Sequence, residues 1–190
     1  MNYTVEAFSD AFNNFEIKPQ KLDKPIKEFM AECKRRGLHN NDNLPSLLAF
    51  RKHKRHVMFM LKQDEKIIGT FGAHSLHLFE NAYRICVRAC VLTDQTEHRS
   101  LRMVNQIRTH QNLLAKYGLD ACIKWVDDPT ANLYISTHPS EIGAMALMHR
   151  IVLPEFAKSG LVERVGDFKY YGVVQTFWKV FPEKYYEQIS

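Results

Sequence analysis

Three apolar runs decide the fold: residues 57–61 read VMFML, residues 66–79 read KIIGTFGAHSLHLF and residues 83–91 read YRICVRACV. In the third run, apolar residues alternate with arginine or cysteine, and a period of two is typical of a strand. Short polar turns at 63–65 and 80–81 separate the three runs. The stretch therefore predicts an antiparallel meander of three strands.

Helical periodicity lies on both sides of this meander. Before it, an apolar stripe predicts a helix over residues 23–37, and a shorter helix is expected from Asn43. After it, apolar residues at helical spacing predict a long helix over 100–116, which Tyr117-Gly118 should end. Residues 120–128 are too few for their period to distinguish a helix from a strand.

The last third of the chain completes an α/β fold. A strand is expected at 133–136, then a helix from Pro139 to Gly160 that Pro154 should kink or shorten. Two final strands, 161–165 and 171–180, are expected on either side of Gly166-Asp167. No linker or repeat divides the chain. We therefore expect one domain over residues 1–190, with a mixed, mostly antiparallel central sheet flanked by helices.

Composition agrees with an ordinary globular chain. The 190 residues are 45% hydrophobic and 25% charged, which excludes wholesale disorder, collagen-like repeats and a disulfide-stapled miniature. The net charge of +5 permits an anionic partner, either nucleic acid or a phosphorylated cofactor. The four cysteines form no CxxC pair, so a zinc ribbon or thioredoxin motif is not expected. Neither a leader peptide nor a membrane span is visible, and we expect a cytoplasmic protein.

One loop connects this fold to a family. At the junction of the meander and the long helix, residues 95–100 read QTEHRS. The order of elements from Asp23 to Val180 resembles the GNAT superfamily, the N-acetyltransferase fold that binds acetyl-coenzyme A. The family has Gln/Arg-x-x-Gly-x-Gly/Ala at this place, so Gln95 matches the pattern, whereas His98 and Ser100 replace its glycines.

The resemblance implies a site for acetyl-CoA or another acyl-CoA as the donor substrate. Glycines in such a loop let backbone N–H groups approach phosphates. Here Arg99 and Arg102 add positive charge at a helix start instead, although both arginines also fit a capped helix exposed to water. The cofactor-binding residues expected from the resemblance are Leu92, Thr93, Gln95, His98, Arg99, Ser100 and Arg102, with Leu92 and Thr93 beside the pantetheine.

The family also implies a base for the amine and an acid for the thiolate. The tyrosine usual on the helix after the fifth strand is absent here, and His149 lies on that helix. The catalytic candidates are therefore His149, Tyr134 on the preceding strand, and Ser136 and His138 at its end; each also fits a packed, hydrogen-bonded residue. No metal site is expected, because His74 and His77 are three apart on a predicted strand and should point to opposite faces.

Three functions fit the sequence. The first is an acyl-CoA-dependent N-acyltransferase that moves an acetyl or related acyl group to a small-molecule or macromolecular amine. The second is a GNAT-fold enzyme that modifies nucleic acid, similar to the Mom-type DNA-modification proteins of phages; the basic run Arg51–His56 favours it. The third is a non-catalytic GNAT-fold binding or virion protein without coenzyme A, favoured by the missing loop glycines and helix tyrosine.

Replacing Arg99 and Arg102 together with alanine should weaken coenzyme A binding and leave the melting temperature nearly unchanged, because their charge would favour phosphate at the helix start. Calorimetric titration with acetyl-coenzyme A gives the dissociation constant of both proteins. An unchanged constant would remove the two arginines from the phosphate site.

Overall fold

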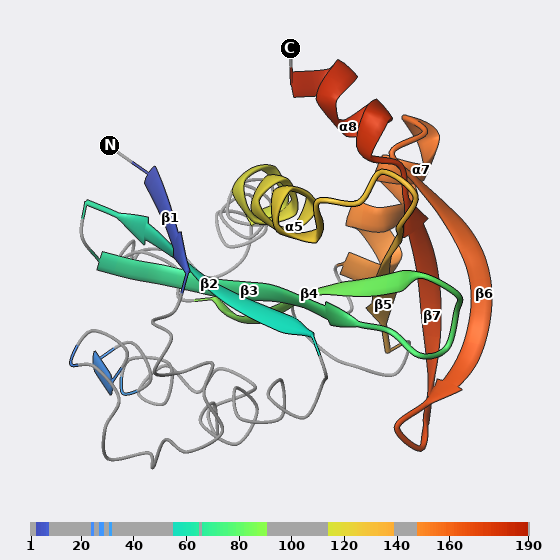
Figure 1. Ribbon diagram of the computed structural model, residues 1–190, viewed down its shortest axis with the longest axis horizontal. Helices are drawn as coiled ribbons and strands as arrows, with labels where there is room; N and C mark the ends of the chain where they lie inside the picture. Colours follow the sequence, from blue (N-terminus) through green and yellow to red (C-terminus); the bar gives the residue numbers. More distant parts are fainter. Residues whose placement is uncertain are drawn as a thin grey trace. The chain divides into compact units, whose positions relative to one another are not determined.

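The computed structural model describes residues 3–7, 24, 27, 28, 31, 55–64, 66–90, 114–138 and 148–189 (Figure 1). The strands are β1 (Tyr3–Ala7), β2 (His56–Gln63), β3 (Lys66–Ser75), β4 (Ala82–Cys90), β5 (Asn132–Thr137), β6 (Val162–Tyr170) and β7 (Val173–Val180). The helical segments are η2 (Leu114–Leu119), α5 (Asp120–Val126), η3 (Met148–Val152), α7 (Leu153–Lys158) and α8 (Pro182–Ile189), of which η2 and η3 are π-helical.

The strands form one mixed sheet in the order β1-β2-β3-β4-β5-β7-β6. The neighbours β4 and β5 run parallel, whereas β1–β2, β2–β3, β5–β7 and β6–β7 are antiparallel. The predicted α/β class with a mixed, mostly antiparallel sheet is confirmed. The predicted strands at 57–61, 83–91 and 133–136 correspond to β2, β4 and β5.

The chain forms two compact units, each assembled from two separate segments. Unit 1 comprises Met1–Ser75 and Cys86–Trp125, and unit 2 comprises Leu76–Ile85 and Val126–Ser190. Strand β4 contributes residues to both. The single domain expected over residues 1–190 stays a prediction.

In unit 1, β2 and β3 supply the core. Met58, Leu61, Ile68 and Phe71 are fully buried, and Phe71 stacks on Phe59 of the facing strand with 5.4 Å between ring centroids. Burying a side chain of this size stabilises a fold by about 1.5–3 kcal/mol. This apolar surface is the platform on which the helical segment η2 packs.

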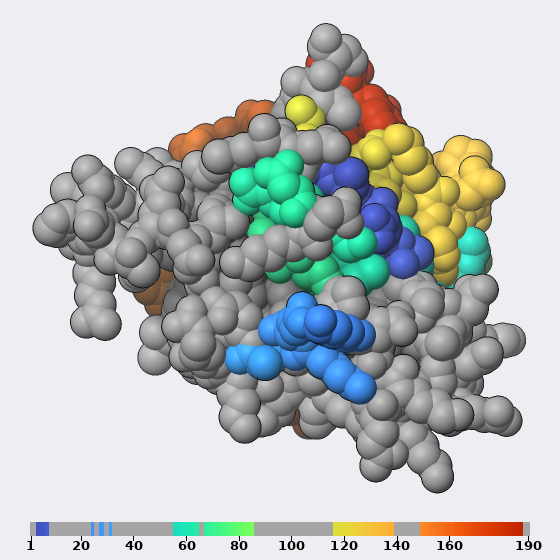
Figure 2. All heavy atoms as spheres, turned by 90° about the vertical axis from the view of Figure 1, so that its left-hand side faces the viewer, coloured from blue at the N-terminus to red at the C-terminus, as the bar shows by residue number. Residues whose placement is uncertain are grey.

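The contact of η2 with the sheet depends on Gly118. A Cβ at this position would lie 3.0 Å from Cγ of Phe71. Beside it, the rings of Tyr3 and Tyr117 lie 5.8 Å apart, and Figure 2 shows β1 against the yellow helical segment. Gly118 therefore permits close packing. The prediction that Tyr117-Gly118 ends the helix is wrong. The helical backbone continues into α5, so residues 120–126 are a helix and not a strand.

In unit 2, a polar cluster holds together the starts of β4 and β5. Asn81 Nδ2 donates to Asp128 Oδ2 (3.2 Å) and to Thr130 Oγ1 (3.0 Å), and its backbone oxygen accepts from the N–H of Asn132 (2.8 Å). The hydrogen bond from the Thr130 side chain, followed by those from its backbone and from Asn81, lowers the pKa of Asp128. The parallel register then runs from Ala82↔Asn132 to Ile85↔Ile135.

The final hairpin differs from the prediction. Strand β6 continues through Gly166-Asp167, where we expected a turn, and its pairing with β7 shifts register between Arg164 and Gly166. The chain reverses instead at Tyr171-Gly172, where both residues have positive φ (49° and 82°), as tight two-residue hairpin turns require. The glycine within the strand thus marks a β-bulge.

The other predicted boundaries lie closer to those in the structure. Strand β3 ends at Ser75, so His77 lies beyond it and not on the strand that we predicted to continue to Phe79. Next to Pro154 the helix changes from the π-helical segment η3 to the α-helix α7. Gly160 (φ 75°) follows the end of α7, as expected. Residues 24, 27, 28 and 31 are helical, in agreement with the predicted helix over 23–37. Strand β1 and helix α8 were not predicted, and the helices expected from Asn43 and over 100–113 lie outside the described residues.

None of the helices that the structure describes is long and apolar enough to cross a membrane.

The Gly118→Ala variant should be less stable than the wild type by about 1–2 kcal/mol. The steric cost of overpacking against Phe71 exceeds the gain of roughly 1 kcal/mol in helix propensity. Chemical denaturation measures the difference. In the background Phe71→Leu, which removes the ring, the same substitution should cost less or become stabilising. Equal costs in both backgrounds would show that the contact with Phe71 does not explain the glycine.

Candidate functional site

The register of three strands brings polar residues of unit 2 into one row. Thr137 of β5 lies opposite Thr176 of β7, and Thr176 lies opposite Asp167 of β6. Because directly paired residues point to the same face of a sheet, the three side chains share one face. Thr176 Oγ1 donates to Asp167 Oδ1 at 2.7 Å. Both threonines are buried, at 1% and 2% exposure, so they form the base of the site.

The bulge in β6 adds a cation to this face. Residues three apart on a regular strand point to opposite faces. The register shift after Arg164 adds one residue to β6, so Arg164 and Asp167 point to the same face. Arg164 lies opposite Trp178. Arg164 Nη2 donates to Asp167 Oδ2 at 2.8 Å, and both side chains are about half exposed.

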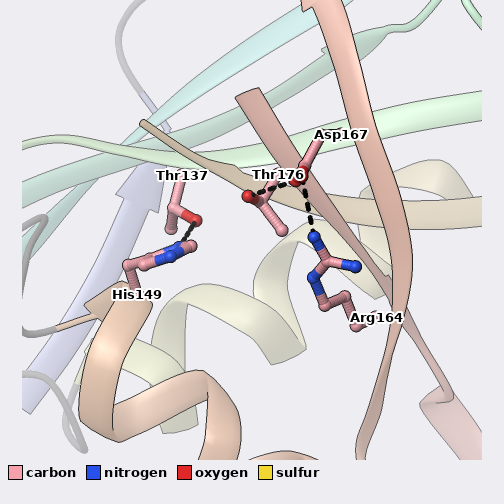
Figure 3. Close-up of polar contacts among 5 residues, drawn as sticks. All are labelled: Thr137, His149, Arg164, Asp167 and Thr176. Atoms are coloured by element: carbon pink, nitrogen blue, oxygen red, sulfur yellow. Dashed lines mark hydrogen bonds and ion pairs between the residues drawn. The ribbon is translucent and has the colours of Figure 1, made fainter. Parts of the chain in front are cut away.

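His149 faces this row from the π-helical segment η3. Its Nδ1 lies 2.9 Å from Thr137 Oγ1, and the ring is half-buried (Figure 3). Either the threonine hydroxyl donates to Nδ1, or a proton on Nδ1 is donated to the hydroxyl oxygen. In both cases Thr137 fixes the ring, and Nε2 makes no hydrogen bond to the part of the chain that the structure describes. Nε2 is therefore the atom of this site with a proton to give or a lone pair to accept one.

Asp167 supplies a fixed negative charge near the imidazole. The hydrogen bond from Thr176 is the main cause that lowers its pKa. Burial, the second largest cause, raises the pKa, and Arg164 and the charge of His149 lower it further. Asp167 is therefore a carboxylate at neutral pH. The site thus combines a positioned imidazole with a neighbouring anion, the elements that general acid–base catalysis requires.

The other predicted catalytic residues of β5 lie on the opposite face. Ser136 is buried and donates from Oγ to Gln175 Oε1 at 2.7 Å. Tyr134 stacks on Phe79 with 4.5 Å between centroids, and burial raises the pKa of its phenol. His138, half-buried, follows the end of the strand. The structure therefore brings His149 together with Thr137 and not with Ser136 or Tyr134; the catalytic roles of all four candidates stay predictions.

The predicted coenzyme A contacts, Leu92, Thr93, Gln95, His98, Arg99, Ser100 and Arg102, lie outside the described residues. Their assignment therefore also stays a prediction. Within the described ranges, no group of three or more His, Cys, Asp or Glu side chains could hold a metal ion.

Sequence reasoning missed three members of the site: Arg164, Asp167 and Thr176. Asp167 was expected in a turn, and Arg164 and Thr176 looked like ordinary strand residues. It also missed Gln175, which binds Ser136 on the opposite face. A glycine inside an apolar strand is a known signal for a bulge. Applied to Gly166, it would have kept Asp167 on a strand.

The described part of the basic run Arg51–His56 makes contacts within unit 1. The guanidinium of Arg55 lies 4.9 Å from the centre of the Trp125 ring, and Nη2 donates to the Trp125 carbonyl at 3.4 Å. Stacking of this kind uses the cation inside the protein. Recognition of nucleic acid by this run stays a prediction, and Arg55 gives it no support.

Comparisons with known proteins identify the fold. No protein-family model and no curated protein matches the sequence. A protein assigned to the GNAT acetyltransferase family, from Desulfovibrio desulfuricans, is 10% identical, with 94% of this chain and 98% of that chain covered and a TM-score of 0.52. A variant of the spermidine N-acetyltransferase SpeG from Vibrio cholerae is 9% identical, with 98% and 99% covered and a TM-score of 0.52. The chain therefore has the fold of the GNAT acetyltransferases over nearly its whole length.

The Asp167→Asn variant should have a lower melting temperature than the wild type at neutral pH. Because the pKa of Asp167 is lowered from 3.8 in the folded protein, its carboxylate stabilises the fold above the unfolded-state pKa, and this contribution is lost as the pH falls through the folded-state pKa. Melting curves of both proteins over a pH series should therefore converge below about 3.8. In a Thr176→Val background, which lacks the main hydrogen bond, the pH-dependent difference should shrink. A difference that is constant with pH would contradict the assignment.

Proposed function

We propose that the protein is an acyl-CoA-dependent N-acyltransferase, which moves an acetyl or related acyl group to an amine. The observation that carries the proposal is the imidazole of His149, held at the sheet by Thr137 in a chain with an acetyltransferase fold. A fold alone does not define an activity, so the proposal depends on this site. The spermidine N-acetyltransferase with the same fold is, by its name, an enzyme that acts on an amine.

The reaction sets two demands on the protein. The acyl-CoA supplies an activated acyl thioester, for which the loop at residues 92–102 is the expected binding segment. As the new C–N bond forms and the C–S bond breaks, the amine must lose a proton and the departing sulfur must gain one. A positioned acid or base typically accelerates such a step by about 10²–10⁴-fold.

We assign this proton transfer to Nε2 of His149. When Nδ1–H donates to Thr137 Oγ1, the lone pair on Nε2 accepts a proton from the amine. The Asp167 carboxylate, fixed by Thr176 and Arg164, stabilises the imidazolium that results. Thr137 and Asp167 are therefore positioning residues, and His149 is the catalytic residue.

Tyr134 is the second candidate acid. A phenol whose pKa is raised by burial stays protonated at neutral pH and can donate to a departing thiolate. Tyr134 lies on the other face of β5, and the amine and the sulfur react at one carbon. Tyr134 is therefore an alternative to His149 and not its partner in the same step. In the same account, buried Ser136 acts through Gln175, and His138 has no assigned step.

Replacing His149 with asparagine should lower kcat by about 10²-fold or more, with little change in the dissociation constant of acetyl-coenzyme A, because asparagine can still reach Thr137 but cannot transfer a proton. Release of free coenzyme A thiol, with a panel of primary amines that includes spermidine and amino acids, measures turnover.

Two variants of Thr137 provide the matched control. Thr137→Ser keeps the hydroxyl and should retain most of the activity, whereas Thr137→Val removes it and should lower kcat and shift the pH profile. If His149→Asn instead lowers mainly the melting temperature, His149 is a structural residue and the catalytic assignment is wrong.

A further inference from the structure

Arg84 of β4 carries a positive charge that no carboxylate among the described residues neutralises. Its Nη2 donates to Gln175 Oε1 at 3.1 Å, and its Cζ lies 5.2 Å from the centre of the Tyr170 ring. Its Nε is buried and has no hydrogen-bond partner. A guanidinium has five N–H donors, so Arg84 retains donor capacity that the described residues do not use.

The two side chains that the structure shows in contact with Arg84, Gln175 and Tyr170, are both neutral. Arg84 lies opposite Tyr134 in the parallel pair, on the same face as Ser136 and Gln175. Gln175 Oε1 accepts from both Ser136 Oγ (2.7 Å) and Arg84 Nη2, so the amide oxygen is fixed toward the guanidinium. Gln175 is 8% exposed and Ser136 is 3% exposed, so this orientation is built into the interior of unit 2.

Aromatic side chains adjoin this group. Phe79 stacks on Tyr134, and the Phe79 and Phe168 rings meet edge to face at 5.1 Å. Tyr170, over which Arg84 lies, packs on Phe177 at 5.8 Å in the same cluster. Apolar surface of this kind lowers the local dielectric, which strengthens the attraction between Arg84 and an anion and makes an uncompensated charge costly.

These observations indicate the charge and shape of the group that would bind Arg84. A partly buried cation is favourable when an anion pairs with it and unfavourable when none does. The two Nη groups and Nε present a planar fork that matches a carboxylate, and a single arginine balances its single charge. A doubly charged phosphate would keep one charge that Arg84 alone does not neutralise.

We propose that Arg84, oriented by Gln175 and Ser136 and stacked on Tyr170, binds the carboxylate of a small-molecule ligand. His149 and Arg84 lie on opposite faces of β5 and β7, and the amine and carboxylate of one amino acid are too close together to reach both faces. The ligand of Arg84 is therefore not the amine whose proton His149 takes. It is a small molecule with a single carboxylate, bound at a site separate from that of proton transfer.

The test measures binding without any acyl-CoA. Calorimetric titration compares three probes: L-phenylalanine, 3-phenylpropionate, which lacks the amine, and phenethylamine, which lacks the carboxylate. Both carboxylates should bind about tenfold or more tightly than phenethylamine, as expected for loss of a charge-assisted hydrogen bond. The variant Arg84→Gln should lose this preference. Arg150→Gln, at an exposed arginine on η3, is the matched control and should keep it.

A second variant tests the proposal even if Arg84→Gln does not fold. Gln175→Glu keeps the acceptor oxygen and places a carboxylate beside Arg84, where it forms an internal ion pair. This protein should melt at a higher temperature than the wild type and bind 3-phenylpropionate about tenfold or more weakly. Unchanged binding in Gln175→Glu, or equal binding of all three probes to the wild type, would overturn the proposal.

The outcomes separate the carboxylate site from the enzymatic activity. If the carboxylate probes bind through Arg84 but no amine stimulates release of coenzyme A thiol, the carboxylate site stands and the acyltransferase proposal fails. If amines stimulate release of coenzyme A thiol but all three probes bind equally well, the acyltransferase proposal stands and the carboxylate site fails.

Discussion

The antiparallel register that joins β5, β7 and β6 determines which side chains can meet in unit 2. It places Thr137, Thr176 and Asp167 in one row, and the bulge after Arg164 adds the arginine to that row. A shift of one residue in the pairing of β7 would turn each of its side chains to the other face. Thr176 would then no longer share a face with Thr137 and Asp167, and Gln175 would no longer reach Arg84. Both sites in unit 2 therefore depend on a single constraint of backbone pairing.

This constraint separates two kinds of chemistry. On one face, a half-buried imidazole lies near a carboxylate that is held by two hydrogen bonds (Figure 3). On the other face, a guanidinium lies against an amide oxygen and an aromatic ring and makes no ion pair with a carboxylate of the described residues. The first arrangement suits the movement of a proton, because its charges are already balanced. The second suits binding, because its charge is completed only when an anion arrives.

Much of the fold could be predicted from the sequence, because strand alternation and helical stripes report which side of an element is buried. The meander, β5 and the change of helix near Pro154 followed from such local signals. Gly118 and Gly166 were misread as terminators, since a glycine that ends an element and one that allows a close approach look the same in sequence. The first meets Phe71, which is 47 residues away in the chain, and the second forms a bulge against β7. His149 was found from its place on the helix, but Asp167, Thr176 and Gln175 join their sites only through pairing between distant strands.

The most direct test of the account is a search for the acylated product. The protein is incubated with acetyl-coenzyme A and an equimolar mixture of amino acids and their decarboxylated amines, and mass spectrometry identifies what becomes acetylated. We expect N-acetylated products, together with free coenzyme A, from the wild type and not from His149→Asn. If the folded protein leaves acetyl-coenzyme A intact with every acceptor in the mixture, the central claim of acyl transfer is contradicted.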